Sequence, residues 1–581
     1  MNSLSTPTYK TSMSVKSGWG AVGLVALPIV CFTLLLLTYA VNVPWMDDID
    51  AFLSFIVGYI DADTTAEKVN WLLRPNNEHR ILTAKIITLF MYTLTGQVNF
   101  RWLILAGYLF LLGILWLFYR VFKTLNLPLL AFVPIPFFLL QPQYYLTSIW
   151  AITGLQHQVV VCLVLTALYM LANGRSNRFA AATGVQLLAS LSMSNGLFGW
   201  VAGAVVLALQ RHWYRLGLWL VVGIATIVFY FHDFHSPQGN ESSFSFFIRQ
   251  PYLIGAAFFT FMGGLFDFFP DADIVKRSIL PTVAGLVLIT AMLRLLWSIL
   301  SNLLGSGMSY TRSAGHGFKT DRQQQYFLVG CYAFLMVNAS VVAFLRPRFG
   351  YSVMLVSNYM VYPALLISLL YLTVLSEYKR SETINRWVRI GILSSIAVFT
   401  ISYFIRWPKV AYRKQVLLTN AFNQKHNGTG LGATWGTPFA ELANHAMTEA
   451  VKRRIYRYPE AYYTAFESIL TPSMQPGGAD STVRIDVSGG GYSYMAETVS
   501  PTTLSLNGSS AVLVQSSQRS YLYVSELPFG MSAFWLNRPV TNVRAEVVNS
   551  LLAPGSYRVG LLLPDAAQQP VRFSSQTITI P

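Results

Sequence analysis

The feature that most constrains this chain is a succession of long apolar runs separated by short basic loops. The first run extends from Gly20 to Val41, and there is no charged residue between Lys16 and Asp47. About 20 apolar residues are enough for a helix to span a bilayer. Only 11% of the 581 residues are charged, against about a quarter in soluble proteins. We therefore predict a polytopic α-helical membrane protein.

The basic residues predict the orientation of the spans, because short loops that carry arginine or lysine stay on the cytoplasmic side. Lys10 and Lys16 precede the first run and acidic residues follow it, which places the N-terminus inside and the loop 42–101 outside. The later basic loops then predict about eleven crossings and an external C-terminus. These loops account for the net charge of +16, so we expect a lipid bilayer and no nucleic acid as partner.

Three apolar segments do not fit a simple crossing pattern. Ile81–Gly96 contains a lysine and several threonines and is predicted to lie in the outer interface. Tyr252–Phe269 contains a glycine pair and is predicted to be re-entrant or interfacial. Phe179–Gln210 is too long for one span and has basic loops at both ends, so it should cross twice and turn at Ser192–Gly196.

The composition changes after the last apolar run and divides the chain into three parts. Residues 1–405 form the predicted transmembrane domain, and residues 406–475 form a helical extracytoplasmic linker. Residues 476–581 alternate apolar and polar side chains, as in Thr482–Val487, between turns rich in Gly, Pro, Asn and Ser. This spacing of short strands predicts a β-sandwich outside the membrane.

An acidic cluster stands where the first span leaves the membrane. Asp47, Asp48 and Asp50 lie within four positions, and a second polar group, Asn76–Arg80, follows in the same outer loop. Neighbouring carboxylates repel one another, so such a cluster is typical of sites of proton abstraction or cation binding. An acidic but merely solvated loop is the alternative, and the residues alone leave both open.

The predicted topology gathers further polar groups on the same outer face, where ionisable residues at span ends are costly unless they are used. The clusters are Asp47, Asp48 and Asp50; Glu78, His79 and Arg80; Gln156 and His157; Ser194 and Asn195; His232, Asp233 and His235; and Arg346, Arg348 and Tyr351. The two arginines predict a phosphate clamp or else a miscounted crossing. The His232–His235 segment is a metal-binding candidate or a plain polar loop, and the sequence leaves open whether a divalent cation takes part.

The order of these features resembles the C-type superfamily of integral-membrane glycosyltransferases. Four motifs look like bacterial membrane proteins of this superfamily: Asn77–Arg80, Ser194–Gly196, Arg348–Gly350 and Ser357–Tyr359. Relatives are expected to carry Ser-Arg-Tyr where this chain has Ser-Asn-Tyr, which removes one expected basic contact. The predicted external β-domain resembles the carbohydrate-binding modules of envelope arabinosyltransferases.

The resemblance implies a glycosyltransferase of the bacterial inner membrane with its C-terminal domain outside. The enzyme would take a sugar from a polyprenyl-phosphate donor and pass it to a glycan, lipid or protein acceptor by one inverting displacement. Asp47 or Asp48 would be the general base. The implied substrate-binding residues are Asp50, Glu78, His79, Arg80, His157, Asn195, Arg346, Arg348 and Tyr359. A flippase or transporter of lipid-linked sugars is the main alternative function, and a non-enzymatic surface or sensor protein is a third.

Overall fold

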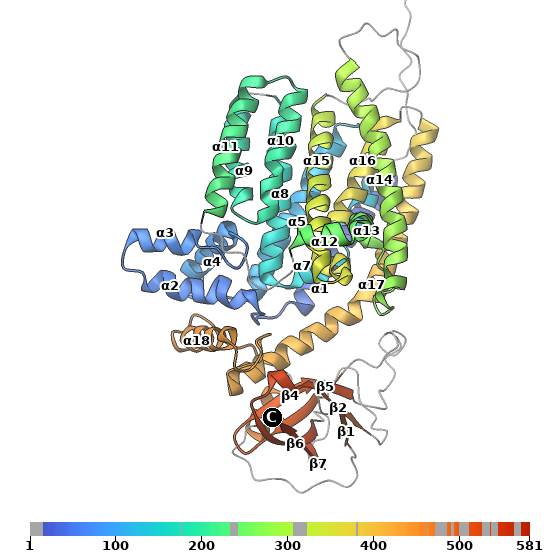
Figure 1. Cartoon of the computed structure of the whole chain (residues 1–581). Helices are drawn as coiled ribbons and strands as arrows, with labels where there is room; N and C mark the ends of the chain where they lie inside the picture. The colour runs from blue at the N-terminus through green and yellow to red at the C-terminus, as the bar shows by residue number, and fades with distance from the viewer. Residues whose placement is uncertain are drawn as a thin grey trace, which may run out of the picture.

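The structure is a computed structural model in which most of the chain is described. The described residues are 16–174, 176–232, 242–305, 322–378, 381–461, 463–470, 485–489, 493–498, 511–525, 535, 544–562 and 571–581. Helices make up the larger part and stand side by side as a bundle, with a small β-domain beyond one end (Figure 1). We call the end of the bundle that faces the β-domain the outer end.

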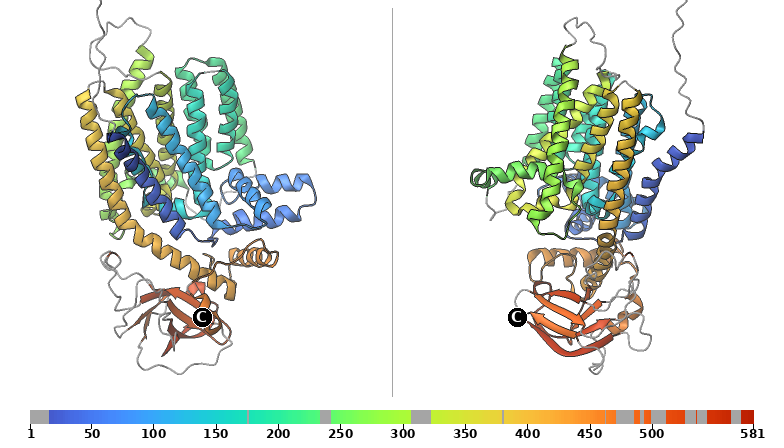
Figure 2. Two further views of the ribbon diagram at one scale, coloured as in Figure 1. Left: turned by 180° about the vertical axis from the view of Figure 1, so that it is seen from behind. Right: turned by 90° about the vertical axis from the view of Figure 1, so that its right-hand side faces the viewer.

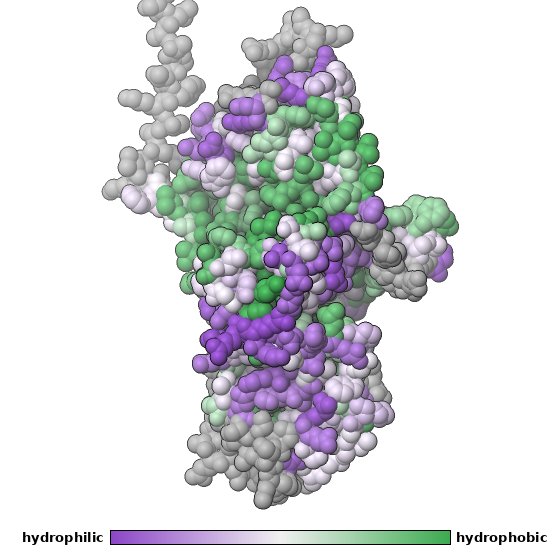
Figure 3. All heavy atoms as spheres, turned by 90° about the vertical axis from the view of Figure 1, so that its left-hand side faces the viewer, coloured by the Kyte–Doolittle hydropathy of each residue, from purple (hydrophilic) through white to green (hydrophobic). Residues whose placement is uncertain are grey.

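Nine helical segments of the described chain are long and apolar enough to cross a membrane. They are α1 (Lys16–Tyr39), α5 (Phe100–Lys123), the broken segment Leu129–Ile149, α8 (Ala151–Ala172), α11 (Trp213–Phe231), α14 (Ile274–Gly305), α15 (Arg322–Leu345), α16 (Val361–Glu377) with the turn before it, and α17 (Ser381–Asn427). The prediction of a polytopic helical protein is confirmed at this level. In the face seen in Figure 3, apolar residues cover the middle of the bundle and hydrophilic residues gather towards both of its ends.

The predicted double crossing forms two shorter helices. They are α9 (Ser176–Ser190) and α10 (Phe198–Leu209), joined at the outer end by the 3₁₀ turn η4 (Ser194–Leu197). The Asn195 side chain is 7% exposed in this turn. A Cβ on Gly196 would lie 2.0 Å from the carbonyl oxygen of Ala189, so this tight approach requires a glycine.

Two further apolar helices are, like α9 and α10, shorter than the hydrocarbon core is thick. The helix α4 (Leu82–Thr95) and the helix α13 (Pro251–Met262) would each be about 20 Å long at 1.5 Å per residue, whereas the hydrocarbon core is about 30 Å thick. With α2 (Phe55–Asp61) and α3 (Thr65–Leu73), α4 forms a lateral layer near the outer end that lies across the bundle direction (Figure 1). Both segments are those that the sequence predicted to be interfacial or re-entrant.

The third crossing is broken by prolines. It consists of η2 (Leu129–Phe132), α6 (Pro134–Leu139), η3 (Pro142–Tyr144) and α7 (Tyr145–Ile149). Proline has no N–H group and clashes with the preceding turn, so it ends or kinks a helix. Most of the broken segment is buried, and it packs against α16 and α17. Its irregular backbone is therefore covered by protein, as the membrane interior requires.

A buried ionic cluster near the outer end of the bundle connects η3, α14 and α17. The Asp267 carboxylate is fully buried and accepts hydrogen bonds from Arg277 (2.9 and 2.6 Å) and Arg406 (2.6 Å). Arg406 also donates to Gln143 Oε1 at 2.6 Å. Removal of the Asp267 carboxylate would leave the buried Arg406 guanidinium without an ionic partner, which typically costs about 3 to 5 kcal/mol. The cluster joins the segment before α14 to η3 and α17.

The helix α17 links the bundle to the C-terminal region. It is 47 residues long and passes the predicted boundary after residue 405 without a break, although Pro408 lies inside it. Its outer part leads towards the β-domain and contacts β4 (Figures 1 and 2). The amphipathic helix α18 (Pro438–Lys452) follows and packs under the π-helical turn η1 (Ile49–Ser54). Two short helices, η9 (Thr464–Phe466) and α19 (Glu467–Leu470), complete this region.

The C-terminal domain contains two antiparallel sheets. Their strands are β1 (Ile485–Gly489), β2 (Ser493–Thr498), β3 (Ala511–Gln515), β4 (Ser520–Val524), β5 (Arg544–Val548), β6 (Gly555–Leu562) and β7 (Val571–Ile580). One sheet has the order β1-β2-β5 and the other β4-β3-β6-β7. Ala545 and Val547 of the first sheet share one buried core with Val514, Tyr557 and Leu561 of the second. The prediction of a C-terminal domain made of β-strands is therefore confirmed.

Candidate functional site

A pocket of about 140 Å³ lies at the outer end of the bundle, where five chain segments meet. A single buried water needs about 10 to 15 Å³ by the same measure, so the pocket admits a larger polar group. The lining residues are Asp47, Asn76, Asn77, His79, Trp150, Ile152, Thr153, Gln156, His157, Met193, Arg346, Asn358 and Tyr359. Five of the predicted site residues are among them: Asp47, His79, His157, Arg346 and Tyr359.

The acidic wall of the pocket consists of the segment Asp47–Asp50 and the turn Asn76–His79, which are joined by hydrogen bonds. Asn76 and His79 exchange backbone hydrogen bonds of 2.8 and 2.9 Å, and Asn77 between them takes a positive φ of 47°. Asparagine tolerates this left-handed conformation better than most residues. The Asn77 side chain donates to Asp47 Oδ1 at 2.9 Å, and the Asn76 side chain donates to Asp50 Oδ2 at 2.8 Å. The turn therefore holds two of the three carboxylates in place.

The neighbouring acids Asp47 and Asp48 have different surroundings. Asp47 lines the pocket and is partly buried, and this burial raises the pKa of its carboxyl above the usual range. Asp48 is 1% exposed, and its oxygens accept the N–H groups of Ile152 (2.9 Å) and Trp45 (3.1 Å). Burial raises the pKa of Asp48 to about 8, although both N–H donors oppose that rise. Asp48 acts as a cap on the first turn of α8, whereas Asp47 is open to a ligand.

His79 and Arg346 supply the polar and cationic part of the pocket. Burial, followed by the charge of Arg346, lowers the pKa of His79 to about 4, so the imidazole is neutral at neutral pH. Its Nδ1 atom is buried and has no hydrogen-bond partner among the described residues. In the described part of the chain, no carboxylate forms an ion pair with Arg346. An arginine in this situation is available to an anionic ligand.

The opposite wall is an aromatic group around His157. The His157 Nδ1 atom lies 3.0 Å from the hydroxyl of Tyr362, which also accepts a 2.9 Å hydrogen bond from Asn195. The rings of Tyr359 and His157 meet edge to face with centroids 5.9 Å apart. Asn195 also donates to Asn338 at 2.7 Å. Asn195 is thus one layer behind the pocket, where it holds Tyr362 and through it His157.

Three predicted binding residues have mainly structural contacts. Arg80 is 5% exposed and donates to the Leu73 carbonyl at the end of α3 and to the Phe229 and Tyr230 carbonyls at the end of α11. Arg348 stacks over the ring of its neighbour Phe349 at 4.6 Å and is absent from the pocket lining. Glu78 is also absent from the lining, and its carbonyl oxygen accepts a 3.4 Å hydrogen bond from Tyr230.

The structure adds residues that sequence reasoning missed. Asn358 lines the pocket, and its Oδ1 atom, like His79 Nδ1, is buried without a hydrogen-bond partner in the described part of the chain. Trp150 lines the pocket and donates to the Trp45 carbonyl at 3.1 Å. The Arg413 guanidinium lies over both tryptophan rings at 5.7 and 5.8 Å, and its Nε and Nη2 atoms are buried without partners. The acidic cluster alone could not predict that Asn358, Trp150 and Arg413, which are far away in the sequence, lie in or beside the pocket.

The unpaired groups indicate what kind of ligand the pocket fits. Nearly all buried polar atoms in proteins are hydrogen-bonded, and each one that is not costs about 1 to 3 kcal/mol. A ligand with hydroxyl groups would satisfy His79 Nδ1 and Asn358 Oδ1, and an anionic group would pair with Arg346. Within the described ranges, no group of three or more His, Cys, Asp or Glu could hold a metal ion. Asp233 and His235 of the metal-binding candidate lie outside those ranges.

Comparisons with known proteins do not identify a relative. No family model matches the chain, and neither a curated protein nor a solved structure is similar to it.

Proposed function

We propose that this protein is a membrane glycosyltransferase that uses a polyprenyl-phosphate-linked sugar as donor. The observation that carries the proposal is the pocket at the outer end, which combines a carboxylate, Asp47, with a cation, Arg346, and two histidines, His79 and His157. A transfer of this kind needs a base for the acceptor and positive charge for the leaving phosphate. The resemblance to the C-type superfamily, drawn from the sequence, agrees with this combination.

In the proposed reaction Asp47 is the general base. The acceptor hydroxyl loses its proton to an Asp47 carboxylate oxygen while the acceptor oxygen bonds to the anomeric carbon. The bond from that carbon to the phosphate oxygen breaks, and polyprenyl phosphate leaves with the electron pair. The attack comes from the face opposite to the leaving group, so the anomeric configuration inverts. The raised pKa of Asp47 makes it a stronger base than an exposed carboxylate.

The remaining pocket residues bind and orient the substrates in this scheme. Arg346 neutralises the charge that develops on the leaving phosphate. His79 is neutral, so its Nδ1 can share a proton with a sugar or acceptor hydroxyl without adding a second cation beside Arg346. Tyr359 and Trp150 offer ring faces and edges for a sugar. Asp48, Asp50 and Asn195 act indirectly, because they fix the segments that carry the pocket.

The proposed location is the bacterial inner membrane, with the pocket on its outer face. In this proposal there are eleven crossings, nine by the long segments and two by the shorter pair α9 and α10, which stand along the bundle direction whereas α3 lies across it (Figure 1). An odd number of crossings puts the two ends of the chain on opposite sides, and Lys10 and Lys16 before the first span assign the N-terminus to the inside. The donor then reaches the pocket from the bilayer, and the β-domain, adjacent to the outer end (Figure 1), binds the acceptor glycan.

The test uses purified full-length protein in lipid nanodiscs and a polyprenyl-phosphate donor with a radiolabelled sugar. We expect labelled acceptor and free polyprenyl phosphate to form in equal amounts, and no transfer from a nucleotide sugar. The alternative, transport, is tested in sealed proteoliposomes, in which the leaflet that holds the lipid-linked sugar is measured. If the lipid-linked sugar changes leaflet while its bond to phosphate stays intact, the protein is a transporter and the proposal is wrong.

A further inference from the structure

A second hollow lies at the inner end of the bundle, opposite to the pocket around Asp47. It is a groove of about 480 Å³ on α5 and α8, more than three times the volume of the outer pocket. The lining residues are Trp116, Tyr119, Arg120, Lys123, Thr124 and Tyr169. Two cations and three aromatic rings therefore share one open groove, at the membrane level where aromatic and basic residues meet lipid headgroups.

The two cations of the groove, Arg120 and Lys123, lie against aromatic rings. The Arg120 guanidinium lies 5.4 Å from the centre of the Trp116 ring, and the Lys123 ammonium lies 5.9 Å from that of Tyr119. No carboxylate forms an ion pair with either of them in the described part of the chain. The ring contacts hold both side chains along the groove. Each cation thus keeps its hydrogen-bond donors for a ligand.

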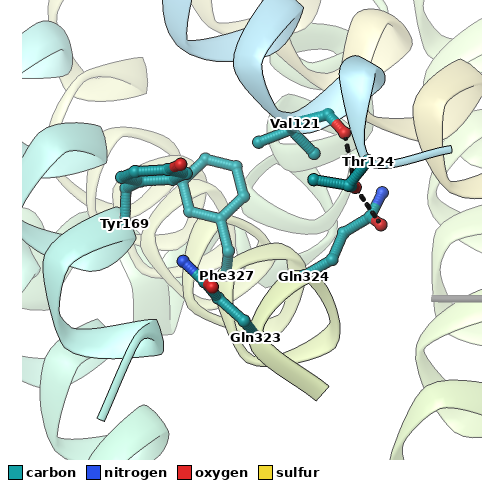
Figure 4. A pocket seen from close by; sticks show the side chains of 6 residues that line it. All are labelled: Val121, Thr124, Tyr169, Gln323, Gln324 and Phe327. Atoms are coloured by element: carbon teal, nitrogen blue, oxygen red, sulfur yellow. Dashed lines mark hydrogen bonds between the residues drawn. The ribbon is translucent and has the colours of Figure 1, made fainter. Parts of the chain in front are cut away.

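A smaller cavity of about 40 Å³ continues the groove between α5, α8 and α15, and it contains an unpaired donor (Figure 4). Gln324 is 4% exposed there. Its Oε1 atom accepts a 3.1 Å hydrogen bond from Thr124, but its Nε2 atom is buried without a partner among the residues that the structure describes. Figure 4 shows Thr124 between Val121 and Gln324. A buried amide with an unpaired N–H group is a site that an acceptor oxygen would satisfy.

An apolar path leads away from the groove along α5. Trp102, Leu109 and Trp116 follow one another at intervals of seven residues and are 61%, 66% and 56% exposed. Seven residues are close to two helical turns, so these side chains lie on one face. The groove thus has cationic and amide donors at its inner end and a continuous apolar face on its membrane side. A soluble anion would contact only the cationic and amide donors, and not the apolar face.

We propose that this groove binds an anionic phospholipid of the inner leaflet. The headgroup phosphate lies between Arg120 and Lys123, with one oxygen towards the Gln324 amide, and an acyl chain runs along Leu109 and Trp116. Basic residues near the bilayer attract anionic lipid, and the aromatic rings suit the headgroup level. The lipid site is at the opposite end of the bundle from the proposed sugar transfer. The lipid proposal therefore does not depend on the proposed function.

The experiment is native mass spectrometry of the full-length protein, titrated with phosphatidylglycerol or with phosphatidylcholine. The test variant is Arg120→Gln/Lys123→Gln. The control is Arg386→Gln/Arg389→Gln, which removes two exposed cations with the same spacing from the inner end of α17. Each basic contact is worth about fivefold in binding, so the test variant should bind phosphatidylglycerol about 30-fold more weakly. The control should stay within about twofold of the wild type, and phosphatidylcholine should bind weakly throughout.

Three results would overturn the proposal. Equal losses in the test and control pairs would mean general attraction of anionic lipid to a basic surface. Equal binding of phosphatidylcholine would mean an apolar surface without headgroup selection. Displacement of the lipid by millimolar inorganic phosphate would mean a site for a soluble anion. If the charge variant does not fold, Gln324→Leu keeps both cations and should bind several-fold more weakly, and unchanged binding there would equally refute the headgroup position.

Discussion

Replacement of Asp47 and of Asp48 by asparagine should have opposite consequences, although the two residues are neighbours. In Asp47→Asn the side-chain oxygen can still accept the hydrogen bond from Asn77, so the fold is unaffected. The variant loses only the proton acceptor. A general base typically contributes about 10² to 10⁴ in rate, so transfer should fall by that factor while the protein keeps its melting temperature.

Asp48→Asn should instead act on stability. Both Asp48 oxygens accept backbone N–H groups, those of Trp45 and Ile152. An asparagine has one acceptor oxygen, so its NH₂ group must face one of these donors. A buried donor left unpaired costs about 1 to 3 kcal/mol. The melting temperature should fall, and the folded fraction should keep most of its transfer rate.

The assay measures sugar transfer from a polyprenyl-phosphate donor, with folded protein matched between variants by size-exclusion chromatography. Thermal unfolding of the same samples gives the second readout. Near-wild-type transfer by Asp47→Asn would refute its role as base. If Asp48→Asn abolished transfer without a change in melting temperature, the assignment of the two acids would have to be exchanged.

Three further predictions follow from the same geometry. Arg346→Gln should raise the KM for the donor by about tenfold or more, because it removes a charge-assisted contact, whereas Arg348→Gln should change it by less than about twofold; equal effects would contradict the pocket assignment. The transfer rate should fall as pH decreases, since the base must be ionised, and burial places this acid limb above the usual carboxyl pKa of about 3.9. A flat pH profile would exclude Asp47 as base. In a cysteine-free background, Ser575→Cys in the β-domain should react with an impermeant maleimide on intact cells and Asn385→Cys only after permeabilisation, and the reverse would invert the topology.

The coarse architecture could be predicted because it depends on patterns that are local in the sequence. Apolar runs of about 20 residues identify spans, and the alternation after residue 480 indicates strands. The same logic predicted that Ile81–Gly96 and Tyr252–Phe269 do not cross; both form short helices, α4 and α13, of the same length range as α9 and α10, so their position in the membrane stays a prediction. The β-sandwich stays a prediction, since residues 499–510 and 526–534 lie outside the described ranges.

The assignment of individual side chains was beyond the sequence because it depends on partners far along the chain. Asp47 and Asp48 are adjacent, yet the N–H group that occupies Asp48 belongs to Ile152, 104 residues away. Arg80 follows a polar turn and Arg346 follows the apolar helix α15, and both were predicted to bind substrate. Only Arg80 donates to the carbonyl groups at the end of α11. Arg413 gave no signal at all, because α17 reads as a linker at that point.

The most direct test of the account is an experimental structure of the full-length protein with a polyprenyl-phosphate sugar, determined by cryo-electron microscopy in nanodiscs with the inactive Asp47→Asn variant. We predict that the phosphate lies within hydrogen-bond distance of the Arg346 guanidinium, with the anomeric carbon facing residue 47. The polyprenyl chain should leave the pocket towards the bilayer. A donor headgroup bound elsewhere, with the pocket between Asp47 and Arg346 unchanged, would contradict the proposed function.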